Sequence, residues 1–360
     1  MRYSASEVCG LLRPLLSGNT RPFLNPLGIE IEWFVYGEDG SPVSLEGQEA
    51  LFEAIKGLSS VWDAGNEVGR NMIEVALRPC MSLREFVKGM LRIFSFLAED
   101  TVARNWRFLF EPSAKETIGW IRKPGYEAAL EALGTEAARY GDPRNSAKVV
   151  RLARENMISY AAFQVNVGVG SYDPFAREVK RLLYFFSNWS PAIALYFESR
   201  DRLSTRRVPD AYGFAQRFRG DGYRDYRFWE NVEDELLRVP QLIRDGECGS
   251  FRYDGRYPAR LNELHLGKLF WDARPRAPYD PDRARVEVRS LGTMSPPLMV
   301  EAVRLYDFLT ELILGEGNSR GLPTLSESEW WSIKRKEFGY AEIVRRLLDE
   351  LGVFGADIFG

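Results

Sequence analysis

The sequence predicts an α+β domain in which helices pack on one side of a mostly antiparallel sheet. One observation is alternation: segments such as "GIEIEWFVY" at 28–36 place apolar and polar residues in turn, as a half-buried strand does. Another is that long intervening segments repeat apolar residues every three to four positions, as amphipathic helices do. Because neither a low-complexity linker nor a fixed-period repeat interrupts the 360 residues, we expect one domain over 1–360.

Local signals place the individual elements. Residues 1–16 carry an apolar stripe interrupted by charges, which indicates a short helix and not a signal peptide. Residues 21–28 contain two prolines and are expected as an irregular lead into the first strand. Ser82 is the expected N-cap of a helix over 82–105, with Glu85 at the capping-box position. Further helices are expected at 45–58, 124–134, 144–157, 175–197, 227–243 and 296–315 and within 315–360, and the one at 175–197 is expected to break at Pro191. Further strands are expected near 60–65, 71–77, 106–112, 158–170, 268–275 and 283–292.

Charge and cysteine usage exclude several classes of protein. The net charge is −3 with 28% charged residues, so no overall field attracts nucleic acid or an anionic membrane. No apolar run reaches the roughly 18 residues of a membrane span. The three cysteines, Cys9, Cys80 and Cys248, form no C-x-x-C pair. They therefore favour a reducing compartment, and we expect a cytoplasmic protein.

The chain contains a single histidine, His265. Histidine-based zinc sites, Ser-His-Asp triads and Cys-His dyads each need imidazoles at defined positions. Chemistry in this chain must therefore depend on carboxylates and guanidiniums.

Carboxylates on the expected strands are the first candidate site. Glu30 and Glu32 would project from the same face of one strand, roughly 7 Å apart. They could be a solvated edge that discourages strand pairing, or ligands of a hard divalent cation. Other strands repeat the pattern of polar residues among apolar ones, with Glu74 in "MIEVAL", Gln164 and Asn166 in "FQVNVG", and Glu287 and Arg289 in "VEVRS".

Each of these carboxylates could also be one half of a structural pair with an arginine. Together, however, they would crowd one sheet face with negative charge that cannot be buried without compensation. Mg²⁺ or arginine must supply that compensation. Guanidiniums that could also bind phosphate are Arg274, Arg289 and the group Arg200, Arg202, Arg206 and Arg207.

Carboxylates for Mg²⁺ combined with arginines for phosphate are typical of phosphoryl transfer from a nucleotide. Neither a G-x-x-x-x-G-K-[ST] loop nor a glycine-rich kinase loop occurs in the sequence. A nucleotide is therefore expected in a groove floored by the sheet.

The order of five short motifs resembles the glutamate–cysteine ligase family, the branch related to glutamine synthetase. These motifs are "GIEIEW", "NEVGRNMIEVALRP", "FQVNVGV", "STRRVPDAYG" and "LFWDARPR" with "ARVEVRS". Glu67 and Glu74 reproduce that family's seven-residue spacing, and Asp272 opens its late W-D-x-R-P motif. The resemblance covers about 28–314, which leaves 315–360 as a C-terminal helical segment.

The resemblance implies a curved sheet in a half-barrel with helices on its outer face. It also implies ATP, Mg²⁺ (two or more ions, with Mn²⁺ as an alternative) and amino-acid substrates, by default the glutamate and cysteine of glutathione biosynthesis. The reaction would form an amide bond through an acyl phosphate. One ion would be held by Glu32, Glu67 and Glu74, and another by Glu30, Gln164 and Glu287. Nucleotide contacts would come from Asn166, Arg206 and Arg274, and transition-state charge would be stabilised by Arg206, Arg274 and Arg289.

Two departures from the family pattern leave other functions open. Gln164 and Asn166 stand where relatives usually carry histidines, and Asn66 replaces a proline before Glu67. A non-catalytic homologue that binds or regulates is one alternative, and a phosphotransferase acting on a guanidino or amino acceptor is another. Homo-oligomer formation is left open.

Overall fold

The computed structural model describes residues 2–17, 21–67, 69, 71–111, 151, 161–169, 177–200, 273–276, 284–315 and 321–353. Within these ranges the chain forms seven α-helices and a nine-stranded sheet in which every strand pair is antiparallel. The expected α+β class is therefore confirmed, whereas closure into a half-barrel stays a prediction. The helices expected at 124–134 and 227–243 lie outside the described residues, as does the helix expected at 144–157 apart from Arg151.

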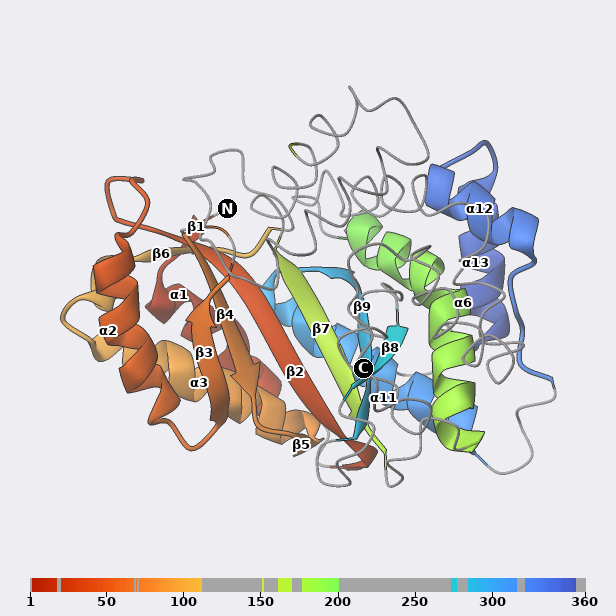
Figure 1. The fold of residues 1–360 in the computed structure, drawn as a ribbon, viewed down its shortest axis with the longest axis horizontal. Coiled ribbons are helices and arrows are strands. Elements are labelled where there is room, and N and C mark those ends of the chain that lie inside the picture. Colours follow the sequence, from red (N-terminus) through yellow and green to blue (C-terminus); the bar gives the residue numbers. More distant parts are fainter. Residues whose placement is uncertain are drawn as a thin grey trace, which may run out of the picture.

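The sheet is built around β2 (Pro22–Tyr36), its longest strand (Figure 1). On one side β2 pairs with β4 (Met72–Leu77), which pairs with β3 (Val61–Asn66). On the other it pairs with β7 (Ala162–Gly168), followed by β9 (Arg285–Gly292) and β8 (Ala273–Arg276). The ends of β2 also pair with β5 (Cys80–Ser82) and β6 (Arg107–Leu109), and β6 pairs with β1 (Arg2–Tyr3).

Strand β2 begins at Pro22, earlier than the sequence predicts, and so includes the expected lead-in. Proline lacks the N–H that a regular ladder requires. The structure accommodates this in an irregularity, because the register against β5 shifts between Pro22 and Leu27. A longer strand with a register shift therefore replaces the predicted irregular segment.

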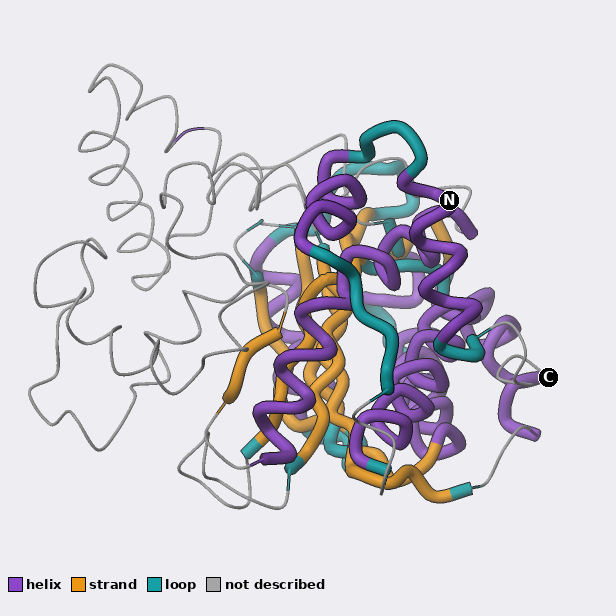
Figure 2. Tube along the Cα trace, turned by 90° about the vertical axis from the view of Figure 1, so that its right-hand side faces the viewer, coloured by secondary structure: helices purple, strands orange, loops and turns teal. Residues whose placement is uncertain are grey.

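One face of the sheet forms the hydrophobic core. Alternate side chains of β2, such as Ile31 and Trp33, are fully buried. Helices α1 (Ala5–Leu12), α3 (Leu83–Glu99) and α11 (Pro296–Leu314) lie together behind the sheet in Figure 1. Figure 2, turned by 90°, shows helices to the right of the layer of strands. The predicted placement of helices on one side is thus confirmed for these three helices. Helix α2 (Leu45–Lys56) packs near β3.

The start of α3 is close to its prediction. The Ser82 hydroxyl accepts from the Glu85 N–H at 3.3 Å, as an N-cap should. The Glu85 carboxylate accepts from the Met81 N–H at 2.7 Å, one residue before the position that a full capping box requires. The first turn of the helix is therefore capped by both side chains, with a shifted second contact.

Helix α6 (Arg177–Arg200) runs through Pro191 without a break, so the predicted break is wrong. Proline at this position cannot donate to the carbonyl of Ser187, four residues earlier. The indole Nε1–H of Trp330 donates to that carbonyl instead, at 3.1 Å. Trp330 belongs to α12 (Glu327–Arg335), and α13 (Tyr340–Glu350) is the second helix described after α11. None of the described helices is both long and apolar enough to cross a bilayer.

Candidate metal centre

The second face of the sheet gathers the polar residues singled out in the sequence. In the strand register, Glu32 of β2 lies directly opposite Glu74 of β4. Two residues earlier, Glu30 lies opposite Gln164 of β7. Side chains two residues apart on a strand share a face, so both carboxylates of β2 project away from the core. The expected common face is confirmed.

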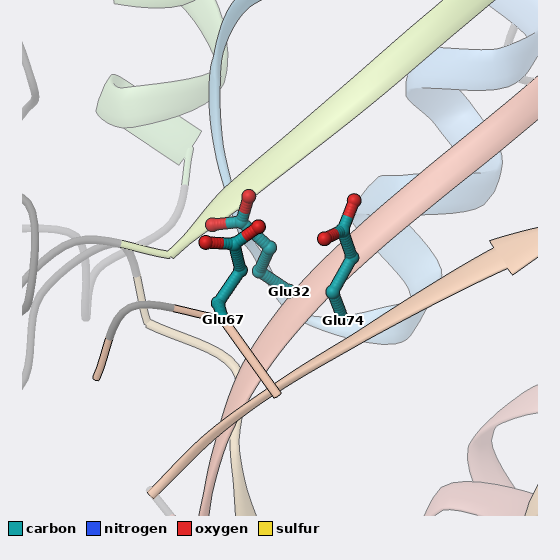
Figure 3. A group of neighbouring side chains, drawn as sticks. All are labelled: Glu32, Glu67 and Glu74. Atoms are coloured by element: carbon teal, nitrogen blue, oxygen red, sulfur yellow. The ribbon is translucent and has the colours of Figure 1, made fainter. Parts of the chain in front are cut away.

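Three carboxylates from three different segments converge at one point. Glu32 comes from β2 and Glu74 from β4, while Glu67 comes from the turn that follows β3 (Figure 3). Each offers an oxygen, and these oxygens all lie within 4.8 Å of one another. Glu32 and Glu67 are only 8% and 7% exposed. We call these three residues the carboxylate cluster.

Burial makes the charged form of the carboxylate cluster costly. It raises the pKa of Glu32 to about 8, and the nearby Glu67 carboxylate contributes to the rise. The pKa of Glu74 is also raised well above its ordinary value, first by burial and then by Glu67. A divalent cation would favour the charged forms and displace the protons. Carboxylate oxygens at this spacing are the donors that Mg²⁺ and Mn²⁺ prefer, so the residues fit such an ion.

Neighbouring groups from β7 hold Glu32 in place. The Ala162 N–H donates to one oxygen of the carboxylate at 2.7 Å, and Gln164 Nε2 donates to the other at 3.3 Å. Both donors come from one strand paired directly with β2. The carboxylate therefore has a fixed orientation next to Glu67 and Glu74 before any ion binds.

Glu30 does not join the carboxylate cluster. Its Oε1 accepts from Asn166 Nδ2 at 3.2 Å and lies 3.8 Å from a guanidinium nitrogen of Arg285. Arg285 Nε also donates to Asn166 Oδ1 at 2.9 Å. Glu30, Asn166 and Arg285 thus each contact the other two, and we call these three residues the arginine–amide triad.

Glu287 of β9 is fully buried and lies opposite Asn166 in the register. Its Oε1 is 3.0 Å from Arg289 Nε, so the two residues form an ion pair. This contact agrees with the interpretation that Glu287 is one half of a structural pair with an arginine. Arg274 lies opposite Glu287 on the other neighbouring strand, β8, but its side chain is outside the described residues.

The predicted arginine group has only one described member. Arg200 ends α6 and forms an ion pair with Glu301 of α11 at 2.5 Å. Tyr196 also accepts a hydrogen bond from it at 2.6 Å. Arg202, Arg206, Arg207, His265 and Cys248 lie outside the described residues.

Arg285 is the residue that sequence reasoning missed. It stands two positions before Glu287 on the same strand, so period-two alternation places it on the same face as Glu287 and Arg289. The segment "ARVEVRS" contained this signal. The contact with Glu30 depended on strand pairing across β7, which the sequence does not specify.

A cavity of about 430 Å³ lies elsewhere, between the end of α6 and helix α13. Its lining includes Tyr196, Lys336 and Tyr340, and none of the carboxylate cluster. Lys336 is paired with Glu198 at 3.1 Å. This cavity and the carboxylate cluster are separate features of the described structure.

Comparisons with known proteins give weak likenesses. No protein-family model and no curated protein matches the chain. A bifunctional glutathione synthetase from Pasteurella multocida is similar with a TM-score of 0.47 and 12% identity, over 97% of this chain and 48% of that one. A glutamate–cysteine ligase from Francisella tularensis, in complex with AMP, is similar with a TM-score of 0.42 and 12% identity, over 92% and 79%. This chain spans about half the length of the first, and with TM-scores below 0.5 these likenesses assign no activity.

Proposed function

We propose that this chain is an ATP-dependent and divalent-cation-dependent carboxylate–amine ligase. The observation that supports the proposal most directly is the carboxylate cluster, in which three buried carboxylates meet on the polar face of the sheet. Buried carboxylates at this spacing repel one another unless a proton or a cation lies between them. The motif order seen in the sequence adds the resemblance to glutamate–cysteine ligases.

In this proposal Glu32, Glu67 and Glu74 hold one Mg²⁺ or Mn²⁺. The bound ion supplies positive charge to the phosphate oxygens of ATP. The N–H of Ala162 and the amide of Gln164 orient Glu32, so that the first ligand is preorganised. Arg289 forms an ion pair with Glu287 and also lies near enough to Glu32 to lower the pKa of that carboxyl. Among the described arginines, we therefore propose Arg289 as the one that faces a transferring phosphoryl group. Arg206 and Arg274 are proposed for the same task.

The proposed reaction has two steps. An oxygen of the substrate carboxylate attacks the γ-phosphorus of ATP, the bond to the β-phosphate oxygen breaks, and ADP leaves. The amine then attacks the acyl carbon, the acyl–phosphate bond breaks, and inorganic phosphate and a proton are released. Neither step needs a covalent side-chain nucleophile, so the reaction is compatible with a chain that contains one histidine.

We propose glutamate and cysteine as default substrates, a half-barrel sheet around them, and the cytoplasm as the compartment.

A non-catalytic binding protein is the second candidate. The ion pair between Glu287 and Arg289, together with the arginine–amide triad, supports it, because both stabilise charges without a ligand. The carboxylate cluster argues against a non-catalytic protein, because keeping these buried carboxylates would lower the stability of the fold without serving a reaction.

A phosphotransferase is distinguished from a ligase by its product, which is a phosphorylated acceptor in place of an amide.

The test is product formation by the purified chain. The protein is incubated with ATP, Mg²⁺ and pairs of amino acids, and both ADP and the amide product are measured by mass spectrometry. Glu67→Gln should abolish both signals, whereas Glu49→Gln, at an exposed position of α2, should leave them unchanged. ADP with a phosphorylated acceptor would replace the ligase by a phosphotransferase. Absence of nucleotide-dependent and Mg²⁺-dependent thermal stabilisation would favour the non-catalytic homologue.

A further inference from the structure

The arginine–amide triad determines how Asn166 is oriented. Arginine can only donate hydrogen bonds, and an ionised carboxylate can only accept them. Asn166 must therefore turn its oxygen toward Arg285, at 2.9 Å, and its NH₂ toward Glu30, at 3.2 Å. The side-chain oxygen of Asn166 is the only atom of that side chain suited to a hard cation, and it already accepts a hydrogen bond from the Arg285 guanidinium.

Glu30 itself is already next to a cation. The guanidinium of Arg285 lies 3.8 Å from its carboxylate, and both side chains are mostly shielded from water, at 26% and 18% exposed. Gln164 likewise directs its NH₂ at Glu32, 3.3 Å away. A second metal ion bound by Glu30, Gln164 and Glu287 would have to reorient this amide and displace Arg285.

Glu287 shows the same arrangement. Its carboxylate is fully buried and lies 3.0 Å from Arg289. Two carboxylates outside the carboxylate cluster are thus each neutralised by an arginine of β9, at positions 285 and 289. These arginines alternate with Glu287 along the strand, so they lie on the face that carries the carboxylate cluster.

We propose that the polar face binds a single divalent cation, at Glu32, Glu67 and Glu74, and that Arg285 and Arg289 occupy the charge-neutralising positions of a second ion. This inference rests on the proposed function and revises the ligand set Glu30, Gln164 and Glu287 that the resemblance implies. A guanidinium is part of the chain and stays charged at any accessible pH. The dependence on Mg²⁺ should therefore follow one saturable site.

Counting bound Mn²⁺ tests the proposal without an activity assay. The free ion gives a strong electron paramagnetic resonance signal that is lost on binding, so titration at pH 8 measures stoichiometry. One ion per chain is expected, with binding weakened at least about tenfold by Glu74→Gln, which removes a ligand charge. Two ions per chain would overturn this inference and leave the proposed ligase intact. No bound ion would remove the cation site on which the proposed function rests, and this inference with it.

Variants of Arg285 test its role directly. Arg285→Met leaves Glu30 without its guanidinium and should raise the stoichiometry from one to two, while Arg285→Lys keeps the charge and should stay at one. Arg107→Met is the matched control, because Arg107 pairs with Glu38 at 3.7 Å on β6 and should have no effect. Melting curves establish that each variant is folded. If folded Arg285→Met still binds one ion, Arg285 does not replace a cation and the proposal fails.

Discussion

Glu32→Gln should stabilise the cation-free protein at neutral pH. The substitution keeps the shape of the side chain and an oxygen for the Ala162 N–H, but it removes the carboxyl whose ionisation burial opposes. A pKa raised by folding means that the folded state binds the proton more tightly than the unfolded state. The stability contributed by this protonated group is complete below pH 4.5 and is lost as pH rises toward about 8.

The size of the effect follows from the two pKa values. The pKa of Glu32 is 4.5 in the unfolded chain and about 8 in the folded chain. Because of this difference, the ionisation of Glu32 lowers the free energy of unfolding by about 3 kcal/mol between pH 4 and pH 7. Glutamine does not titrate, so Glu32→Gln should recover much of that loss at pH 7 and none at pH 4. For a chain of 360 residues, about 3 kcal/mol corresponds to a Tm rise of roughly 4 °C.

The assay is thermal melting from pH 4 to pH 8 with a chelator present, for the native chain, Glu32→Gln and Glu49→Gln. The gain for Glu32→Gln should grow with pH, while the exposed Glu49 variant should follow the native curve. A Glu32→Gln protein that melts lower than the native chain at pH 7 would refute this reasoning. Glu32 would then be a structural acceptor whose charge the fold requires.

Three further predictions separate the roles of other groups. The Tm gain from Mg²⁺ should increase between pH 6 and pH 8, because the ion displaces protons from carboxyls with raised pKa values; a flat profile in melting experiments would exclude binding at the carboxylate cluster. Glu287→Gln should lower the unfolding free energy by about 2 kcal/mol in urea titrations, since Arg289, which is 21% exposed, loses a buried counter-charge. Asn188→Ala should cost about 3 kcal/mol in the same assay, because two buried backbone groups of Leu325 lose their partner, and a cost below about 1 kcal/mol would show that water replaces it.

Periodicity predicts the sheet face but not every boundary. Alternation in β2, β4, β7 and β9 placed the acidic residues on one face, since side-chain direction on a strand is a local property. The helix predicted over 82–105 ends earlier, at Glu99, and two other differences from the prediction involve proline. At Pro22 the register against β5 shifts, and at Pro191 the indole of Trp330 donates to the carbonyl that proline leaves without its helical donor. Both features involve segments that are distant in the sequence, which a local signal does not contain.

The contacts of the candidate site are also only partly predictable from the sequence. The pairing of Glu32 with Glu74 and the approach of Glu67 depend on the register of β2 and β4 and on the turn before β4. The motif spacing of the family resemblance anticipated this convergence, whereas periodicity alone did not. The contacts of Arg285 with Glu30 and Asn166 were missed because they cross from β9 over β7 to β2, and strand order is not written in any one segment.

The strand register shows how strongly the fold crowds negative charge at the carboxylate cluster. Like charges directly opposite each other on antiparallel strands are destabilising, and Glu32 and Glu74 occupy such a pair. Elsewhere on the same face an arginine lies beside the half-buried Glu30 and another beside the buried Glu287. The described carboxylates of the cluster instead face one another, and desolvation raises the pKa values of Glu32 and Glu74. Arg289 lies near enough to lower the pKa of Glu32, but it only partly offsets this crowding, and the remaining excess of carboxylates is the reason for proposing a cation there.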